Sequence, residues 1–121
     1  MKEKPSILII EDDQFNYDLL QIILAGLNVR IYRAKTADKG MKYFKEKAID
    51  LVLMDIKLPD KNGYQLTREF KSLDSSVPVI AQTSYALAGD REKATEAGCD
   101  DYLAKPIKKA KLLETVKSYL Q

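Results

Sequence analysis

Three short apolar runs restrict the folds that are open to this chain. They are ILII at residues 7–10, LVLM at 51–54 and VPVIA at 77–81, and they are apolar at every position rather than at every second one. Strands with this pattern are buried on both faces, as in a parallel sheet that helices cover on each side. With two further short runs, the sequence predicts strands over residues 6–10, 29–32, 50–54, 77–81 and 101–104.

Segments with helical spacing separate these strands. They predict helices over about residues 14–25, 36–48, 64–74, 86–97 and 107–120. Asp13 and Thr36 are the predicted N-caps of the first two helices, and Gly98 is the predicted end of the fourth. Strands that alternate with helices imply right-handed crossovers and an α/β fold with helices on both faces of the sheet.

The spacing within the first and last helices also predicts which side chains face the core. In the first helix the three- and four-residue intervals connect Phe15, Leu19, Ile22 and Ile23. In the last helix they connect Ala110, Leu113, Val116 and Leu120.

Composition excludes several classes of protein. With 121 residues, 45% of them hydrophobic, the chain is expected to form one domain over residues 1–121. It has no histidine and a single cysteine, which excludes an intrachain disulfide, Cys/His zinc sites and a Ser-His-Asp triad. The net charge of +2 is spread along the chain, so we expect no binding to nucleic acid. No apolar run approaches the ~20 residues that span a bilayer and no signal peptide is evident, so we expect a cytoplasmic protein without membrane contact.

Acidic residues stand directly after two of the buried strands. Asp55 ends the run at 51–54, and Glu11, Asp12 and Asp13 end the run at 7–10. In an open parallel sheet the carboxyl ends of neighbouring strands, about 4.8 Å apart, meet at the ligand crevice. Carboxylates that close raise one another's pKa unless a cation lies between them, and Mg²⁺, or Mn²⁺ in its place, prefers such oxygen ligands. The alternative interpretation is a set of acids that are each solvated alone.

Two further strand ends supply groups for a phosphoryl site at the same edge. The run at 77–81 continues into Thr83 and Ser84, and the strand at 101–104 is followed by Lys105. A carboxylate beside a metal ion, an ammonium group and a hydroxyl can attack phosphorus to give an aspartyl phosphate, because the cations offset the charge on the equatorial oxygens. Asp55 is therefore the candidate nucleophile.

Four stretches of the sequence carry a resemblance to a known family. They are ILIIEDDQFN (7–16), LVLMDIKLPDKNG (51–63), the pair Thr83-Ser84 and AGDREKATEAGCDDYLAKPI (88–107). In this order and spacing the chain resembles a response-regulator receiver domain of two-component signalling over essentially its whole length, in particular the receivers of hybrid sensor histidine kinases. The resemblance implies a flavodoxin-like (βα)5 three-layer sandwich whose parallel sheet has the order 2-1-3-4-5.

The resemblance also implies a Mg²⁺ site in which Mn²⁺ can substitute. Its protein ligands are expected to be Asp12 directly, Glu11 mainly through water, the phosphorylated Asp55, and the backbone carbonyl of Lys57. The three consecutive acids allow a second register, in which the pair is Asp12 and Asp13. The hybrid-kinase pattern in the residues after the pair favours the first register.

Around the phosphoryl group the resemblance assigns three further roles. Thr83 matches the switch hydroxyl that hydrogen-bonds the phosphoryl group, Lys105 the lysine that pairs with its oxygens, and Tyr102 the aromatic rotamer switch. The Lys105–Pro106 bond is expected to be cis, which is uncommon for an X-Pro bond. Phosphorylation is expected to shift the population of two states and so to remodel the output face made by the fourth helix, fifth strand and fifth helix.

The phosphoryl donor has to come from another domain or protein, because a phosphohistidine requires a histidine and this chain has none. The resemblance implies a sensor histidine kinase or a histidine phosphotransfer protein. We expect this partner to dock near the site on the first helix, where Phe15 and residues 17–20 include apolar side chains, some of which must face the core. The resemblance also implies a monomer or a weak phosphorylation-dependent dimer. The domain is expected to be a regulatory phosphoacceptor that catalyses only its own phosphotransfer and dephosphorylation.

Three alternatives share part of this pattern. A phosphohydrolase of the haloacid-dehalogenase type needs a second aspartate two residues after the nucleophile, where this chain has Lys57. A flavodoxin-like cofactor carrier needs a phosphate loop after the first strand, where the acidic residues would repel a phosphate. A receiver that serves only as a docking surface would not need the five site positions that are filled here.

Lys57 and Tyr85 lie two residues after Asp55 and Thr83, where they border the route of the attacking water in the family. Both side chains are long. We hypothesise that they shield the phosphoryl group and lengthen the lifetime of the phosphorylated state. The alternative is that both side chains point to solvent.

Overall fold

A single parallel sheet organises the chain in the structure, a computed structural model that describes residues 4–84 and 89–120. Within these residues the strand order is β2-β1-β3-β4-β5. The strands are β1 (Ser6–Ile10), β2 (Arg30–Ala34), β3 (Leu51–Asp55), β4 (Val79–Thr83) and β5 (Asp101–Ala104). The helices are α1 (Gln14–Leu24), α2 (Ala37–Glu46), α3 (Gly63–Leu73), α4 (Asp90–Ala97) and α5 (Lys109–Leu120). The predicted α/β, flavodoxin-like fold and its strand order are confirmed.

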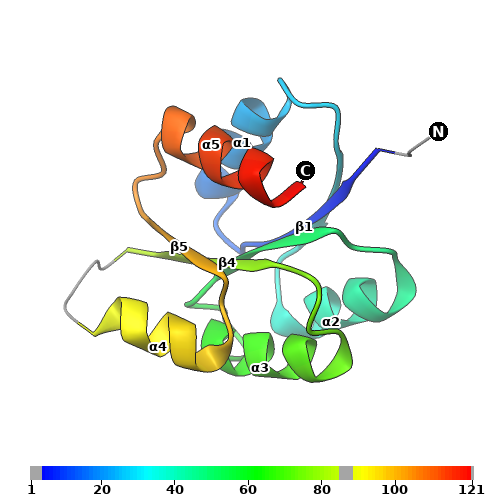
Figure 1. Cartoon of the computed structure of the whole chain (residues 1–121), viewed down its shortest axis with the longest axis vertical. Coiled ribbons are helices and arrows are strands. Elements are labelled where there is room, and N and C mark those ends of the chain that lie inside the picture. Colours follow the sequence, from blue (N-terminus) through cyan, green and yellow to red (C-terminus); the bar gives the residue numbers. More distant parts are fainter. Residues whose placement is uncertain (1–3, 85–88, 121) are drawn as a thin grey trace.

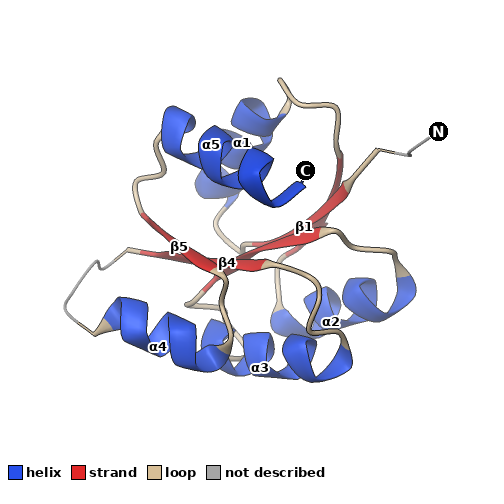
Figure 2. Cartoon of the chain, in the orientation of Figure 1, coloured by secondary structure: helices blue, strands red, loops and turns tan. Residues whose placement is uncertain are grey.

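Helices cover both faces of the sheet and give three layers. Figure 1 shows α1 and α5 on one side of the sheet and α2, α3 and α4 on the other. Figure 2 shows the strands as the middle layer between them. Successive residues of a strand point to opposite faces, so Ile7 and Ile9 of β1 pack with α1 and α5, whereas Leu8 and Ile10 pack with α2 and α3. The uninterrupted apolar runs therefore serve two cores, one on each side of the sheet.

Three predicted capping residues lie at helix ends in the structure: Asp13 and Thr36 at the starts of α1 and α2, and Gly98 at the end of α4. The Asp13 carboxylate accepts a hydrogen bond from the Asn16 amide at 2.8 Å, and the Thr36 hydroxyl accepts one from the Lys39 amide at 3.1 Å. Gly98 ends α4 with a φ of 102°, a left-handed conformation that glycine adopts without a steric penalty. These caps fix where the loops leave the helices.

Two residues of α1 that the sequence predicts to face the core face solvent instead. Phe15 is 76% exposed and Ile22 is 72% exposed, whereas Leu20, Ile23 and Leu24 are buried. Apolar residues fill most of α1, so intervals of three and four fit two different stripes of side chains. Packing against the sheet buries Leu20, Ile23 and Leu24, and it leaves Phe15 and Ile22 at the surface.

The last helix shows the same kind of difference. Leu112 and Val116 are fully buried, and Leu113 and Leu120 pack partly against the same core. Ala110, which the helical spacing predicts to face inward, is exposed. An alanine side chain has little apolar area to bury, so the larger Leu112 determines the rotation of α5.

Both boundaries of β4 differ from the prediction, because the strand runs from Val79 to Thr83 rather than over 77–81. Pro78 has no amide hydrogen for the ladder, which delays the start of the strand. At the other end, Gln82 continues the strand although it is polar, and its side chain is fully buried. Strand β2 likewise extends to Ala34 rather than to residue 32.

Helix α4 begins at Asp90 in the structure. The predicted start near Ala86 and the hypothesis about Tyr85 both lie outside the described residues.

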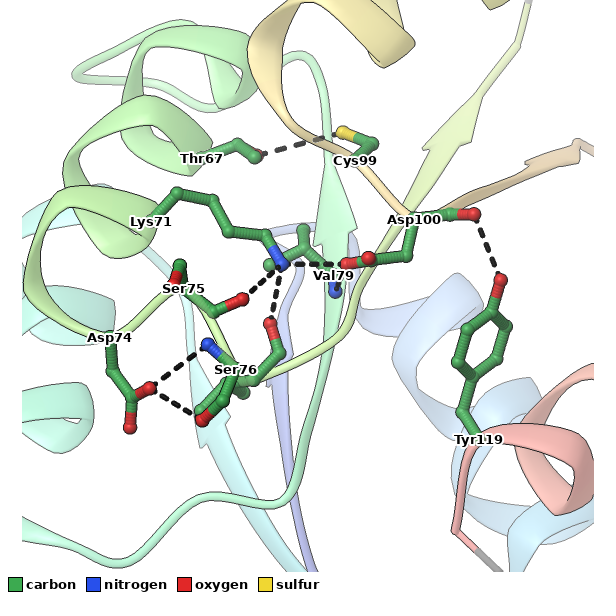
Figure 3. Close-up of polar contacts among 10 residues, drawn as sticks. Thr67, Lys71, Asp74, Ser75, Ser76, Val79, Cys99, Asp100 and Tyr119 are labelled. Atoms are coloured by element: carbon green, nitrogen blue, oxygen red, sulfur yellow. Dashed lines mark hydrogen bonds and ion pairs between the residues drawn. The ribbon is translucent and has the colours of Figure 1, made fainter.

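A polar network holds the amino ends of β4 and β5, opposite the edge where the acidic residues lie. The Lys71 ammonium donates to the Val77 carbonyl at 2.8 Å and pairs with Asp100 Oδ2 at 2.7 Å. The same Asp100 oxygen accepts the Val79 amide at 2.8 Å, and the Tyr119 hydroxyl donates to the Asp100 backbone carbonyl at 2.8 Å (Figure 3). The network therefore joins α3, the starts of two strands and α5.

Candidate functional site

Three carboxylates come together at the carboxyl edge of the sheet. Glu11 and Asp12 directly follow β1, and Asp55 is the last residue of the neighbouring β3, one position beyond the pair formed by Ile10 and Met54. One oxygen from each of Glu11, Asp12 and Asp55 lies within 4.8 Å of the others. Glu11 is fully buried and Asp55 nearly so, whereas Asp12 is exposed. The acidic group is therefore buried at its base and open to solvent at Asp12.

The third consecutive acid has a different place. The Asp13 carboxylate caps α1, and Asp13 does not belong to the group of gathered carboxylates. Of the two registers that the sequence leaves open, the geometry thus matches the one that pairs Glu11 with Asp12.

Lys105 brings a positive charge to the base of this group. Its ammonium lies 3.2 Å from Glu11 Oε1 and 3.2 Å from Asp55 Oδ1. At the start of the loop after β5, the Lys105 amide donates to the Thr83 carbonyl at 2.7 Å. The Lys105–Pro106 bond is cis, as expected. A single lysine therefore bridges the carboxylates that end β1 and β3.

The surroundings shift the pKa of both buried partners. Burial, followed by the negative charge of Asp55, raises the pKa of Glu11 from 4.5 to about 7, although Lys105 and the Asp13 amide oppose the rise. Burial alone would lower the pKa of Lys105, but the charges of Glu11 and Asp55 outweigh it and raise that pKa above 10.5. The pKa of Glu11 stays raised although Lys105 opposes the rise, so one lysine does not offset the burial and the negative charge of the crevice, and a further cation there is favoured.

The donor set of the crevice suits a hard divalent cation. Glu11, Asp12 and Asp55 offer carboxylate oxygens, and the gathered group contains neither a histidine nor a cysteine. Mg²⁺ prefers such oxygen donors and keeps several waters, which the exposed Asp12 side of the crevice can accommodate. The residues therefore fit a Mg²⁺ ion.

The loop after β3 folds back over the end of the strand. The Lys57 amide donates to Asp55 Oδ1 at 3.3 Å, Lys57 forms an isolated bridge with Asn62, and the Gly63 amide donates to the Ile56 carbonyl at 2.8 Å. A Cβ on Gly63 would come within 2.8 Å of Ile56 Cα, so only glycine allows this close approach. The loop thereby keeps the Lys57 backbone next to Asp55, while its side chain is exposed.

The remaining predicted residues lie on the two strands beyond β3. Thr83 is the buried last residue of β4, one position past Gln82, which pairs with Asp55 in the ladder. Tyr102 of β5 is half-buried, packs beside Ala94 of α4, and has the Arg91 guanidinium 5.4 Å from its ring centroid. Thr83 is thus near the carboxylates, whereas Tyr102 lies toward α4.

Two further residues near the site were not predicted from the sequence. Arg33 of β2 donates from Nε and Nη2 to the Glu11 carbonyl, at 3.2 Å each. Gln82 places a fully buried amide on the strand beside Asp55. An arginine near the end of a short strand has no pattern of its own, whereas a polar residue within an apolar run was a signal that could have identified Gln82.

Residues 7–117 match the family model of the response regulator receiver domain. The chain belongs to the response regulator receiver family. Receivers of this family are regulatory phosphoacceptors and not classical enzymes, and they interact with histidine kinases. Signalling by phosphorylation is thus implied at the level of the family, and the acidic pocket of Glu11, Asp12 and Asp55 is typical of that role. Membership sets aside the phosphohydrolase and cofactor-carrier alternatives.

Similar proteins include both single receivers and receivers of kinases. The polar-differentiation response regulator DivK of Brucella anthropi is 35% identical over 117 residues, which are 95% of each chain. The receiver domain of a sensor histidine kinase from Pseudomonas aeruginosa, with magnesium coordinated in its active-site cleft, is 34% identical with a TM-score of 0.87, over 97% of this chain and 98% of that one. The BeF3-activated receiver domain of DrrB, from Thermotoga maritima, is 30% identical with a TM-score of 0.89 and covers 98% of each chain.

Within the described residues, none of the helices combines the length and the apolar composition that crossing a bilayer requires.

Proposed function

We propose that Asp55 accepts a phosphoryl group from a phosphohistidine of a partner protein and that this event switches the output face of the domain. The observation that carries the proposal is the meeting of three carboxylates with one lysine at the carboxyl edge of the sheet. A carboxylate held beside an ammonium group and a divalent cation is a suitable nucleophile for phosphorus, because both cations offset the charge of the phosphoryl oxygens.

Four residues are proposed to hold the Mg²⁺ ion: Asp12 and Asp55 through their carboxylates, Glu11 mainly through water, and Lys57 through its backbone carbonyl. The ion, for which Mn²⁺ can substitute, would supply charge stabilisation for the phosphoryl oxygens. The magnesium in the cleft of the Pseudomonas aeruginosa receiver supports this assignment.

In the proposed transfer, one Asp55 carboxylate oxygen forms a bond to phosphorus while the bond between phosphorus and the donor imidazole nitrogen breaks. The electron pair of the broken bond returns to the imidazole. Lys105, now 3.2 Å from Asp55 Oδ1, would pair with an oxygen of the new phosphoryl group. The Thr83 hydroxyl, on the adjacent strand, would donate a hydrogen bond to another of these oxygens.

The proposed switch follows from the position of Thr83 between the site and β5. Movement of Thr83 toward the phosphoryl group would make room for Tyr102 to turn inward, because both residues lie along the border between β4, β5 and α4. The face made by α4, β5 and α5 would then differ between the two states, and an output partner that binds one state would shift the population.

The partner is proposed to be a sensor histidine kinase or a histidine phosphotransfer protein that docks on α1. Phe15 and Ile22, one heptad apart, present exposed apolar side chains on the first helix after the acidic crevice. Of the residues 17–20 named from the sequence, Leu20 is buried, and Tyr17 and Leu19 pack partly against the core. The proposed contact therefore centres on Phe15 and Ile22.

The proposal is tested by incubating the protein with a small phosphodonor and Mg²⁺. We expect a protein-bound phosphoryl label that hydroxylamine releases, as it does from an acyl phosphate. Asp55→Asn should abolish the label, whereas Asp38→Asn, which alters an exposed acid on α2, should retain it. Failure of the wild-type protein to take up the label would favour the alternative of a receiver that serves only as a docking surface.

A further inference from the structure

Arg33 of β2 joins an edge strand to the acidic crevice and to α1. Its Nε and Nη2 donate to the Glu11 carbonyl at 3.2 Å each, and its Nη1 donates to Gln14 Oε1 at 2.8 Å. Its guanidinium carbon lies 4.2 Å from the centroid of the Tyr17 ring. One side chain thus contacts both the segment that carries the proposed metal ligands and the first turn of the following helix.

These contacts hold the backbone of Glu11 from both sides. The Glu11 amide donates to the Ala34 carbonyl at 2.9 Å, and the Glu11 carbonyl accepts the two guanidinium donors beyond the end of the ladder. A planar guanidinium with two donors on one oxygen restricts the peptide more than a single donor does. The peptide that Arg33 contacts joins Glu11 to Asp12, so it connects the backbone positions of the two carboxylates.

Arg33 also places a positive charge beside three consecutive acids without using any of their carboxylate oxygens. Its donors go to a backbone carbonyl and to the Gln14 amide group, so the carboxylates of Glu11 and Asp12 keep their lone pairs for other partners. The charge alone would oppose a second cation in the crevice, by Coulomb repulsion. The contacts of Arg33 with the Glu11 backbone would favour metal binding, whereas its charge would oppose it.

We propose that Arg33 is a positioning residue that pre-organises the Glu11–Asp12 segment for Mg²⁺, and that this effect exceeds its Coulomb repulsion of the ion. The inference rests on the proposed function, since it assumes that Glu11 and Asp12 serve a metal ion. Outer partners that orient metal ligands commonly change affinity by 10–100-fold when they are removed.

The test measures Mg²⁺ affinity by amide NMR titration without any phosphodonor, for Arg33→Gln, Arg33→Lys and the wild type. We expect about tenfold weaker binding in both Arg33 variants, because lysine keeps the charge but not the planar fork. Arg30→Gln is the matched control, since it removes the same charge from an exposed side chain on the same strand. Its affinity should stay within about twofold of the wild type, because exposed charges are screened.

Hydrogen exchange in the Mg²⁺-free protein supplies a second measurement. The Asp13 amide donates to Glu11 Oε2 at 3.2 Å, so loss of the Arg33 contacts should accelerate exchange of this amide selectively. Equal or tighter Mg²⁺ binding by Arg33→Gln than by Arg30→Gln would overturn the inference and leave the proposed function intact. Absence of Mg²⁺ binding by the wild type, or its persistence in Asp12→Asn together with Asp55→Asn, would overturn the proposed metal site and the inference with it.

Discussion

Replacement of Glu11 by glutamine removes a carboxyl group whose pKa the fold raises. Glu11 is fully buried beside Asp55, and its pKa rises from 4.5 to about 7. A glutamine amide places its NH2 group at the Oε1 position, 3.2 Å from the Lys105 ammonium, which adds a penalty that does not depend on pH. It has the same shape as glutamate and keeps an oxygen for the Asp13 amide. Glu11→Gln should therefore preserve packing while removing the charge.

The raised pKa means that the folded protein holds a proton on Glu11 more tightly than the unfolded chain does. Between pH 4.5 and about 7, the unfolded state ionises while the folded state stays protonated, so stability falls as the pH rises through this window. One pKa unit corresponds to about 1.36 kcal/mol, so the shift costs at most about 3 kcal/mol above the folded pKa. Below the unfolded pKa both states are protonated and the cost disappears.

Urea unfolding in EDTA across this pH range provides the assay. The stability of Glu11→Gln relative to wild type should rise by about 2–3 kcal/mol from the acidic end to the alkaline end. Glu46→Gln, at the exposed end of α2, is the control and should follow the wild type. Mg²⁺ should stabilise wild type more than Glu11→Gln at the alkaline end, because binding favours the ionised crevice. A constant difference between Glu11→Gln and wild type at every pH would refute the reasoning.

Three further predictions concern other parts of the molecule. Phe15→Ala with Ile22→Ala should lower kcat/KM for transfer from a phosphohistidine partner about tenfold, because apolar contact area is lost, while labelling by a small phosphodonor stays unchanged. Lys71→Met should destabilise the fold by about 2 kcal/mol in urea unfolding, since Asp100 and the Val77 carbonyl lose a charged donor; equal stability would contradict the role of the network in Figure 3. Lys57→Ala should shorten the lifetime of the aspartyl phosphate by about two- to threefold if the exposed side chain shields it, and an unchanged decay rate would discard that hypothesis.

Most of the fold could be predicted from the sequence because burial on both faces leaves an unmistakable pattern in β1, β3 and β4. The N-caps Asp13 and Thr36 could also be predicted, because each bonds an amide only three residues away. The buried face of α1 could not be predicted, because its apolar residues fit two stripes. Packing against the sheet places Phe15 on the exposed side of the helix.

The gathering of Glu11, Asp12 and Asp55 followed from strand ends alone, since neighbouring parallel strands bring their carboxyl ends to one edge. The bridging position of Lys105 was suggested by its place after β5 but its contacts depend on the loop geometry. The hydrogen bonds from Arg33 to the Glu11 carbonyl could not be predicted, because they join a side chain of an edge strand to a backbone atom that follows the neighbouring strand.

The central claim is that Asp55 forms an aspartyl phosphate, and the most direct measurement locates the modified residue. Protein incubated with a small phosphodonor and Mg²⁺ is treated with borohydride, which reduces an acyl phosphate to homoserine, and its peptides are analysed by mass spectrometry. We predict homoserine at Asp55 and none at Glu11 or Asp12, with formation dependent on Mg²⁺. Homoserine or its glutamate-derived counterpart at another acidic residue, with Asp55 unmodified, would contradict the account.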